Sequence, residues 1–234
     1  MEKQSRKNQG DAAISELKEA IRIDPDNAGA HANLGIIYQA QGNPDPAIAE
    51  YKKVIRIDPD NASAHFNLGN AYLGQDKLDA AIAEYKKAIR IDPDNAIAHN
   101  NMGISYIKQD KLDAAIAEYK KVIRIDPDNA GAHYLLGDAY LRQDKHDAAI
   151  SELKEAIRID PDNADAHSML GDLYYRRDDL DAAISEFKEA IRIDPDNAGA
   201  HFNLGNAYLG QDKLDPAIAE FKEAGRLDPD FKVT

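Results

Sequence analysis

Six of the seven histidines in this 234-residue chain recur at intervals of 34 residues, and histidine is a side chain with which a metal site or a general base is commonly built. The six are His31, His65, His99, His133, His167 and His201, whereas His146 stands apart. A zinc site or a general base needs two or more groups that converge within a few ångströms. Equivalent residues one helix pair apart are separated by roughly 20 Å, since each helix is ~10 Å across. We therefore interpret the six histidines as half-buried residues that pack between helices, and we predict no metal site.

Carboxylates cluster in six Asp-Pro-Asp-Asn turns, where a calcium site could be sought. These turns lack the spacing, the central glycine and the bidentate glutamate of an EF-hand loop. Capping of the adjacent helices accounts for them without an ion. The sequence contains no glycine-rich phosphate loop, nucleophile elbow or HExxH motif. We predict that the chain is not an enzyme and binds no cofactor.

The composition further limits the classes of molecule that the chain is expected to bind. Acidic residues outnumber basic ones by 42 to 29, which gives a formal net charge of -13. Such a surface repels phosphate backbones and anionic lipid headgroups, so we expect neither nucleic acid nor membrane as a partner. The absence of cysteine excludes a disulfide framework and a thiolate nucleophile. Because no apolar run approaches the ~20 residues that span a bilayer, we expect a cytoplasmic protein.

A repeat of 34 residues organises the whole chain. The string IRIDPDNA begins at Ile21 and recurs at Ile55, Ile89, Ile123, Ile157 and Ile191, and a decayed copy, GRLDPDF, begins at Gly225. We divide the chain into a partial repeat over 1–27, six blocks, and a tail over 232–234. The six blocks are 28–61, 62–95, 96–129, 130–163, 164–197 and 198–231.

Each block predicts two helices joined by a short turn, as block 62–95 illustrates. Leu68 and Tyr72 are four residues apart and share one helical face. Asp79 is a candidate cap for a second helix, whose apolar stripe begins at Ala81 and Ile82. Proline follows the equivalent aspartate in two blocks, at Pro46 and Pro216, where the first helical turn tolerates it.

The end of each block predicts the start of the next. Asp92-Pro93 ends the second helix, and Asp94 or Asn95 offers an N-cap for the helix that follows. Since both helices are too short to be stable alone in water, stacking between neighbours must supply most of the stability.

These residues resemble the tetratricopeptide repeat family over essentially the whole chain. The resemblance rests on a Leu-Gly or Met-Gly pair and a tyrosine in each first helix, and on an alanine and usually an aromatic residue in each second helix. The pairs begin at Leu34, Leu68, Met102, Leu136, Leu170 and Leu204, and the tyrosines are Tyr38, Tyr72, Tyr106, Tyr140, Tyr174 and Tyr208. The alanines are Ala47, Ala81, Ala115, Ala149, Ala183 and Ala217, and the following residues are Tyr51, Tyr85, Tyr119, Leu153, Phe187 and Phe221. The resemblance implies an all-α fold, a right-handed superhelical α-solenoid of antiparallel helix pairs.

Two features depart from the family pattern. Histidine occupies the fourth place of each block, where the family often has a large apolar residue. The family also favours glycine in the turn within a block, and here only Gly42 keeps it. Aspartate takes its place elsewhere, at Asp76, Asp110, Asp144, Asp178 and Asp212. Aspartate tolerates left-handed backbone better than most residues, so we expect the turn to survive.

In this family the first helices line a concave groove that binds peptides, so the resemblance implies a protein or peptide partner. The places that face the groove carry apolar and aromatic side chains beside asparagines that can both donate and accept. The predicted groove residues are Phe66, Asn67, Asn70, Leu73, Ile97, Asn100, Asn101, Ile104, Lys108, Tyr134, Asp138, Arg142, Met169, Asp172, Tyr175, Arg176, Phe202, Asn203 and Asn206.

Some of these side chains have a second interpretation. Leu73, Leu141 and Leu209 could equally pack against neighbouring helices. The cations Lys108, Arg142 and Arg176 recur at one place and could meet an acidic partner. Asp138–Arg142 and Asp172–Arg176 are also i,i+4 pairs, worth about 0.2–0.5 kcal/mol each, and we slightly favour this intrahelical interpretation.

A different class of function remains open: a designed or consensus-like repeat protein whose property is structural. Residues 65–79 and 201–215 are identical, HFNLGNAYLGQDKLD, which supports that alternative. Apolar side chains at Tyr208, Phe221 and Phe231 also raise the hypothesis of homo-association through the terminal repeats. The groove places differ between blocks more than the packing places do, which favours binding.

Overall fold

A computed structural model describes the backbone of residues 2–228 and the side chains of residues 10–228. These residues form thirteen α-helices and contain no strand. The helices are α1 (Glu2–Ile23), α2 (Ala28–Ala40), α3 (Pro44–Ile57), α4 (Ala62–Leu73), α5 (Leu78–Ile91), α6 (Ala96–Lys108), α7 (Leu112–Ile125), α8 (Ala130–Arg142), α9 (His146–Ile159), α10 (Ala164–Arg176), α11 (Leu180–Ile193), α12 (Ala198–Gly210) and α13 (Leu214–Leu227).

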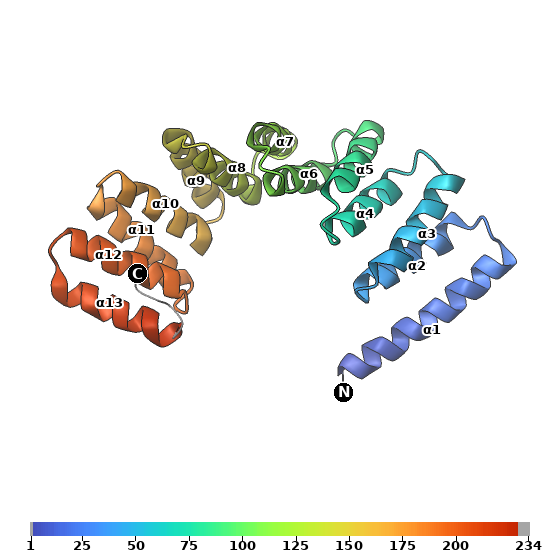
Figure 1. Ribbon diagram of the computed structural model, residues 1–234, viewed down its shortest axis with the longest axis horizontal. Helices are drawn as coiled ribbons and strands as arrows, with labels where there is room; N and C mark the ends of the chain where they lie inside the picture. Colours follow the sequence, from blue (N-terminus) through green and yellow to red (C-terminus); the bar gives the residue numbers. More distant parts are fainter. Residues whose placement is uncertain (1, 229–234) are drawn as a thin grey trace. The chain divides into compact units, whose positions relative to one another are not determined.

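The helices are paired within two compact units, residues 1–125 and 126–234 (Figure 1). We call the even-numbered helices first helices and the odd-numbered ones second helices. In each unit a first helix packs against the second helix that follows it, as α2 does against α3 and α8 against α9. The second helix then packs against the next first helix, as in α3 with α4 and α9 with α10. The predicted all-α solenoid of antiparallel helix pairs is confirmed.

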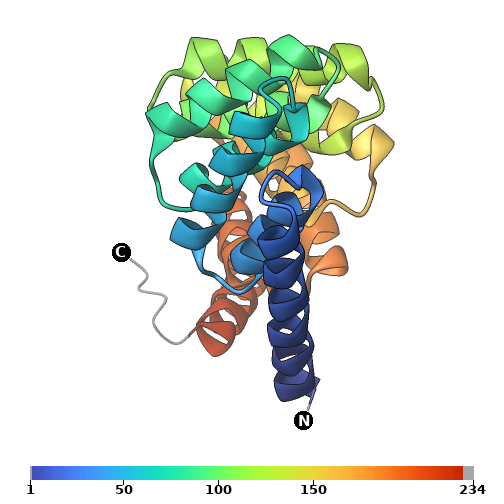
Figure 2. The same ribbon diagram turned by 90° about the vertical axis from the view of Figure 1, so that its right-hand side faces the viewer.

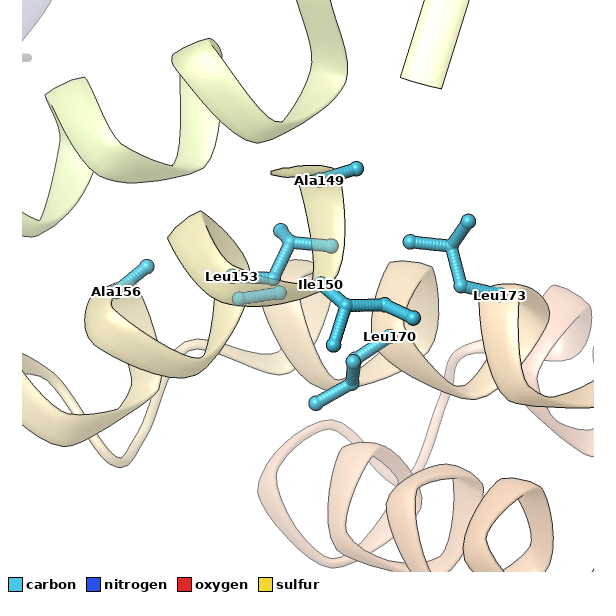
Figure 3. Packing of buried hydrophobic residues seen from close by; sticks show 7 residues of the cluster. Ala149, Ile150, Leu153, Ala156, Leu170 and Leu173 are labelled. Carbon is cyan, nitrogen blue, oxygen red and sulfur yellow. The ribbon is translucent and has the colours of Figure 1, made fainter. Parts of the chain in front are cut away.

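Within the units, small core clusters lie at the α3–α4, α5–α6, α9–α10 and α11–α12 junctions. At the α9–α10 junction, Ile150 and Leu153 of α9 meet Leu170 of α10 (Figure 3). At the α3–α4 junction, Ile48 and Tyr51 take the same roles against Leu68. These are the residues whose helical spacing predicts an apolar face, and each cluster removes that face from water.

Asparagine caps start the first helices, as predicted for one of the two candidates. The side chain of Asn95 accepts a hydrogen bond from the backbone N–H of Ala98 at 2.9 Å, so Asn95 and not Asp94 is the cap. The predicted cap of the second helix is wrong. Helix α5 begins at Leu78, with Lys77 at the N-cap, and Asp79 lies in its first turn. There the negative charge of the carboxylate interacts favourably with the helix dipole, and Oδ1 accepts a hydrogen bond from Gln109 at 2.9 Å.

The turns within the pairs adopt left-handed backbone, as predicted. Asp76, Asp110, Asp144, Asp178 and Asp212 have φ between 56° and 61°, and Gly42 has φ of 72°. This conformation lets the chain reverse within three residues, so the second helix can lie antiparallel to the first.

The N-terminal helix, which lies in the partial repeat predicted over 1–27, is longer than the second helices of the full repeats. It runs without a break from Glu2 to Ile23, over 22 residues, whereas α3 and α5 have 14 residues each. The expectations for Pro229, Phe231 and the tail at 232–234 lie outside the described residues. In the part of the chain that the structure describes, none of the helices combines the length and apolar character that crossing a bilayer requires.

Close contact between the two helices of a pair depends on glycine. A Cβ atom on Gly35 would lie 2.6 Å from Cε1 of Tyr51, which is itself buried. We expect Gly35→Ala to lower the free energy of unfolding by about 1–3 kcal/mol, because the aromatic ring cannot move away in a packed core.

Gly29 on the same helix provides the control, since its Cβ would lie 3.5 Å from the nearest atom. Gly29→Ala should leave stability unchanged or raise it by up to about 1 kcal/mol. Urea unfolding followed by circular dichroism measures both variants. Equal midpoints for the two would contradict the assigned contact.

Candidate functional site

The six repeated histidines are buried and hydrogen-bonded at both ring nitrogens. Nδ1 of each contacts a glutamate 19 residues later, at 2.5–2.7 Å. Nε2 lies 3.0–3.2 Å from a proline carbonyl oxygen in the preceding turn. The pairs are His31–Glu50, His65–Glu84, His99–Glu118, His133–Glu152, His167–Glu186 and His201–Glu220.

This network requires a proton between each histidine and its glutamate. A carbonyl only accepts, so Nε2 of His99 must donate to Pro93. The 2.6 Å contact between Nδ1 of His99 and Oε2 of Glu118 then needs a second proton on one of the two atoms. Lys121 donates to the other glutamate oxygen at 2.9 Å, so both oxygens of the Glu118 carboxyl group are hydrogen-bonded.

The sequence analysis placed these histidines between helices but missed their partners. The available signal was a glutamate at a constant distance in every block. The prediction of half-buried histidines is wrong in degree, because the side chains are enclosed and tie the two helices of a pair to the turn before them. Among the described residues no three His, Cys, Asp or Glu side chains gather as a metal site would require. The network therefore has the features of a structural element.

The predicted groove residues all lie on first helices, and none of them is fully buried. In the unit of residues 1–125 they lie on α4 and α6, and in the unit of residues 126–234 on α8, α10 and α12. Neighbouring first helices contact each other directly, α2 with α4, α4 with α6, and α10 with α12. Each unit therefore presents a surface made of adjacent first helices.

On the first unit, several polar side chains of this surface are already paired. Oδ1 of Asn70 accepts hydrogen bonds from the Tyr85 hydroxyl at 2.7 Å and from Nδ2 of Asn101 at 2.8 Å. Lys108 donates to Asp76 of the preceding turn at 3.0 Å. These bonds join α4 to α6, and they fix the orientation of the amides that an incoming chain would meet.

The second unit repeats this arrangement with a carboxylate. Nδ2 of Asn203 donates to Oδ1 of Asp172 at 2.8 Å, which joins α12 to α10. Arg142 donates to Asp138 on its own helix at 2.8 Å, so the intrahelical interpretation of that pair is confirmed.

Apolar side chains on these surfaces fall into two groups. Phe66, Leu73, Tyr134, Leu141 and Met169 are partly exposed and pack against the core clusters. In contrast, Ile97 is 65 % exposed, Leu209 48 % and Tyr175 41 %. The second group is available for contact with another molecule.

Burial changes the ionisation of groups near the two surfaces. It raises the pKa of Tyr51 to about 12, and it raises the pKa of Tyr85 further although the hydrogen bond with Asn101 opposes the change. Burial also raises the pKa of Asp172, while the positive charge of Arg176 lowers it. The tyrosine hydroxyls are thus neutral donors at physiological pH.

Removing one partner of a histidine–glutamate pair should destabilise the chain. Glu118→Ala leaves the buried Nδ1 of His99 without a partner, and we expect a loss of about 1–3 kcal/mol in the free energy of unfolding. Glu118→Gln keeps the shape and an amide that can hydrogen-bond Nδ1, so this variant should lose clearly less of the free energy of unfolding. Urea titration compares the two; a Gln variant as unstable as the Ala variant would show that charge, and not hydrogen bonding, is the larger contribution.

Comparison with known proteins agrees with the geometry. A TPR repeat profile matches residues 6–42 and 171–212, and tetratricopeptide repeat profiles match 33–96, 72–136, 106–173, 141–188 and 198–231. No curated protein sequence matches the chain significantly.

Solved structures give the same fold. MamA is 32 % identical with a TM-score of 0.66, over 69 % of this chain and 95 % of MamA. YrrB, described as a TPR protein with an unusual peptide-binding site, is 24 % identical with a TM-score of 0.65, over 77 % of this chain and 93 % of YrrB. The C-terminal part of a TPR protein from Cytophaga hutchinsonii is 16 % identical with a TM-score of 0.80, over 97 % of this chain and 93 % of that one. With paired helices in phase and these matches along its length, the chain belongs to the tetratricopeptide repeat family.

Proposed function

We propose that the chain is a non-enzymatic scaffold that binds a peptide or protein segment on the first helices of its units. The observation that carries this proposal is the exposure of Ile97 on α6 and of Tyr175 and Leu209 on α10 and α12. These side chains are not part of the core clusters, and α6 and α12 also carry asparagines, namely Asn100, Asn101, Asn203 and Asn206. Apolar anchors beside polar groups are the features that recognise an extended segment.

The net charge of the chain favours a partner with cationic residues. Lys108 and Arg142 are already bound to Asp76 and Asp138, which weakens the case for an acidic partner. The net charge of -13 attracts a basic segment and speeds its association at low salt. A segment with apolar anchors and lysine or arginine between them therefore fits best.

The second candidate function is structural: a designed or consensus-like protein, or one that self-associates through its ends. The identity of residues 65–79 and 201–215 favours it, as does the exposure of Ile218 on α13. Light scattering coupled to size exclusion separates the two. A mass near 25.8 kDa at all concentrations supports the free scaffold, and a mass that rises with concentration supports self-association.

The binding proposal can be tested with peptides selected from a random twelve-residue library on the intact chain. We expect selected peptides to be rich in basic and apolar residues, and to lose at least tenfold in affinity for Ile97→Asp or Tyr175→Asp. Fluorescence anisotropy measures the change.

Ile218→Asp is the matched control, because the exposed fraction of Ile218, 50 %, lies between those of Ile97 and Tyr175, and Ile218 is on a second helix. Peptides that bind both first-helix variants as tightly as the unaltered chain would contradict the proposed surface.

A further inference from the structure

Helix α1 has the sequence of a second helix but lacks a first helix beside it. Residues 11–28 and 147–164 are identical, DAAISELKEAIRIDPDNA, so α1 and α9 carry the same packing residues. In α9 the four residues Ala149, Ile150, Leu153 and Ala156 are buried, the most exposed being Ile150 at 8 %. Their equivalents in α1, Ala13, Ile14, Leu17 and Ala20, are all partly exposed. On α9 the side that contacts α8 includes Ala149, Glu152 and Leu153, and we call the equivalent side of α1, with Ala13, Glu16 and Leu17, the uncovered face.

The difference between the two helices is the neighbour that covers them. Helix α9 packs between α8 and α10, whereas α1 packs extensively against α2 alone among the described helices. Within residues 2–228 the chain does not supply this neighbour, because α1 continues as one helix to Glu2 (Figure 2). The same sequence therefore has one of its two partners in one place and both in the other.

The missing helix leaves a cleft beside α1. The cleft has a volume of about 890 Å³ and is lined by Gly10 of α1 and by Ile36, Ile37 and Ala40 of α2, among others. One repeat further on, the equivalent residues are Pro44, Asn70, Ala71 and Gly74, and the space between them is about 210 Å³. Gln39, at the end of the first helix α2, and Gly42, in the turn after it, line that smaller space. There, the end of α2 and the turn after it occupy most of the equivalent position.

The chemistry of the missing neighbour can be deduced from Glu16. This residue is equivalent to the six glutamates that bind a histidine on the first helix of their own pair. Glu152 in the identical sequence contacts His133 of α8 at 2.7 Å. Glu16 is exposed and has no such partner within residues 10–228. A helix that covers α1 in the manner of α8 brings a histidine to Glu16.

We propose that the uncovered face of α1 docks a first helix supplied by a separate protein chain, with the residue pattern of α8. The occupant is an amphipathic helix in which alanine, histidine and a Leu-Gly pair fall on one face, as Ala132, His133, Leu136 and Gly137 do on α8. Its histidine binds Glu16, and its glycine lies against Leu17, as Gly137 lies against Leu153. This surface is separate from the first-helix surfaces of the proposed function, so the two proposals stand or fall independently.

The test uses a fluorescein-labelled peptide of residues 128–145, DNAGAHYLLGDAYLRQDK, titrated with the full chain. We expect saturable binding that Leu17→Asp weakens at least tenfold. Leu17 is partly exposed in the free chain, so the variant should fold, and circular dichroism verifies this. Ile218→Asp, which places the same charge at an exposed position on α13, should leave the affinity unchanged.

The histidine–glutamate contact is tested separately. Glu16→Gln in the chain and His133→Ala in the peptide should each weaken binding, and the two changes together should cost less than the sum of the separate effects. Absence of saturable binding, or equal affinity of Leu17→Asp and the unaltered chain, would overturn the proposal. A chain mass that doubles with concentration and returns to one copy in Leu17→Asp would also overturn it, because the occupant would then be a second copy.

Discussion

The sandwiching of a second helix between two first helices is the contact on which the rest of the structure depends. A helix of about fourteen residues is barely stable alone in water, because nucleation is costly and few bonds follow it. Tyr85 shows what changes when both neighbours are present: it is fully buried, next to Ile82 and to Met102 of the following helix. Caps, turns and hydrogen bonds then determine the orientation of the next helix. Without the burial of the second helix, the helices that they orient would not be stable.

The histidine–glutamate pairs contribute specificity of alignment to these contacts. Apolar stripes of alanine and isoleucine tolerate sliding by a helical turn, since similar residues recur along them. A buried imidazole that must meet one carboxylate and one carbonyl allows a single alignment of the two helices and the preceding turn. We regard the pairs as the elements that specify the alignment within a helix pair, while the apolar clusters supply most of the free energy.

Local features could be predicted from the sequence because they depend on neighbours a few residues away. The spacing of Leu68 and Tyr72 predicts a helical face, Asn95 predicts a cap, and Asp110 predicts a left-handed turn; the structure has all three. Asp79 was assigned wrongly as a cap, because the left-handed turn before it, and not the capping preference of aspartate, determines where the helix begins. The extension of α1 to Glu2 has no counterpart in the repeat, so periodicity could not predict it.

For the candidate site, the sequence predicted which helices carry the residues but not the hydrogen bonds that those residues make. Repeat register places Asn70 and Asn101 on first helices, but it says nothing of the bond between them or of the Tyr85 hydroxyl that shares the same oxygen. Those contacts depend on the distance between helices that are 31 residues apart in the chain. Likewise, register treats Leu73 and Leu209 alike, and only the neighbour that follows decides that one is packed and the other exposed.

The identity of residues 11–28 and 147–164 also sets a problem for the chain as it is made. When α8 leaves the ribosome, α1 already exists, and its face is the same as that of α9, which has not yet been synthesised. Until α9 has been synthesised, the copy of this sequence that α8 can meet is the one in α1, which is not its native partner. The three residues between α8 and α9 resolve the competition, because so short a tether gives α9 an effective concentration in the millimolar range once it emerges. Because the competing surfaces are chemically the same, correct pairing depends on the short connection between α8 and α9.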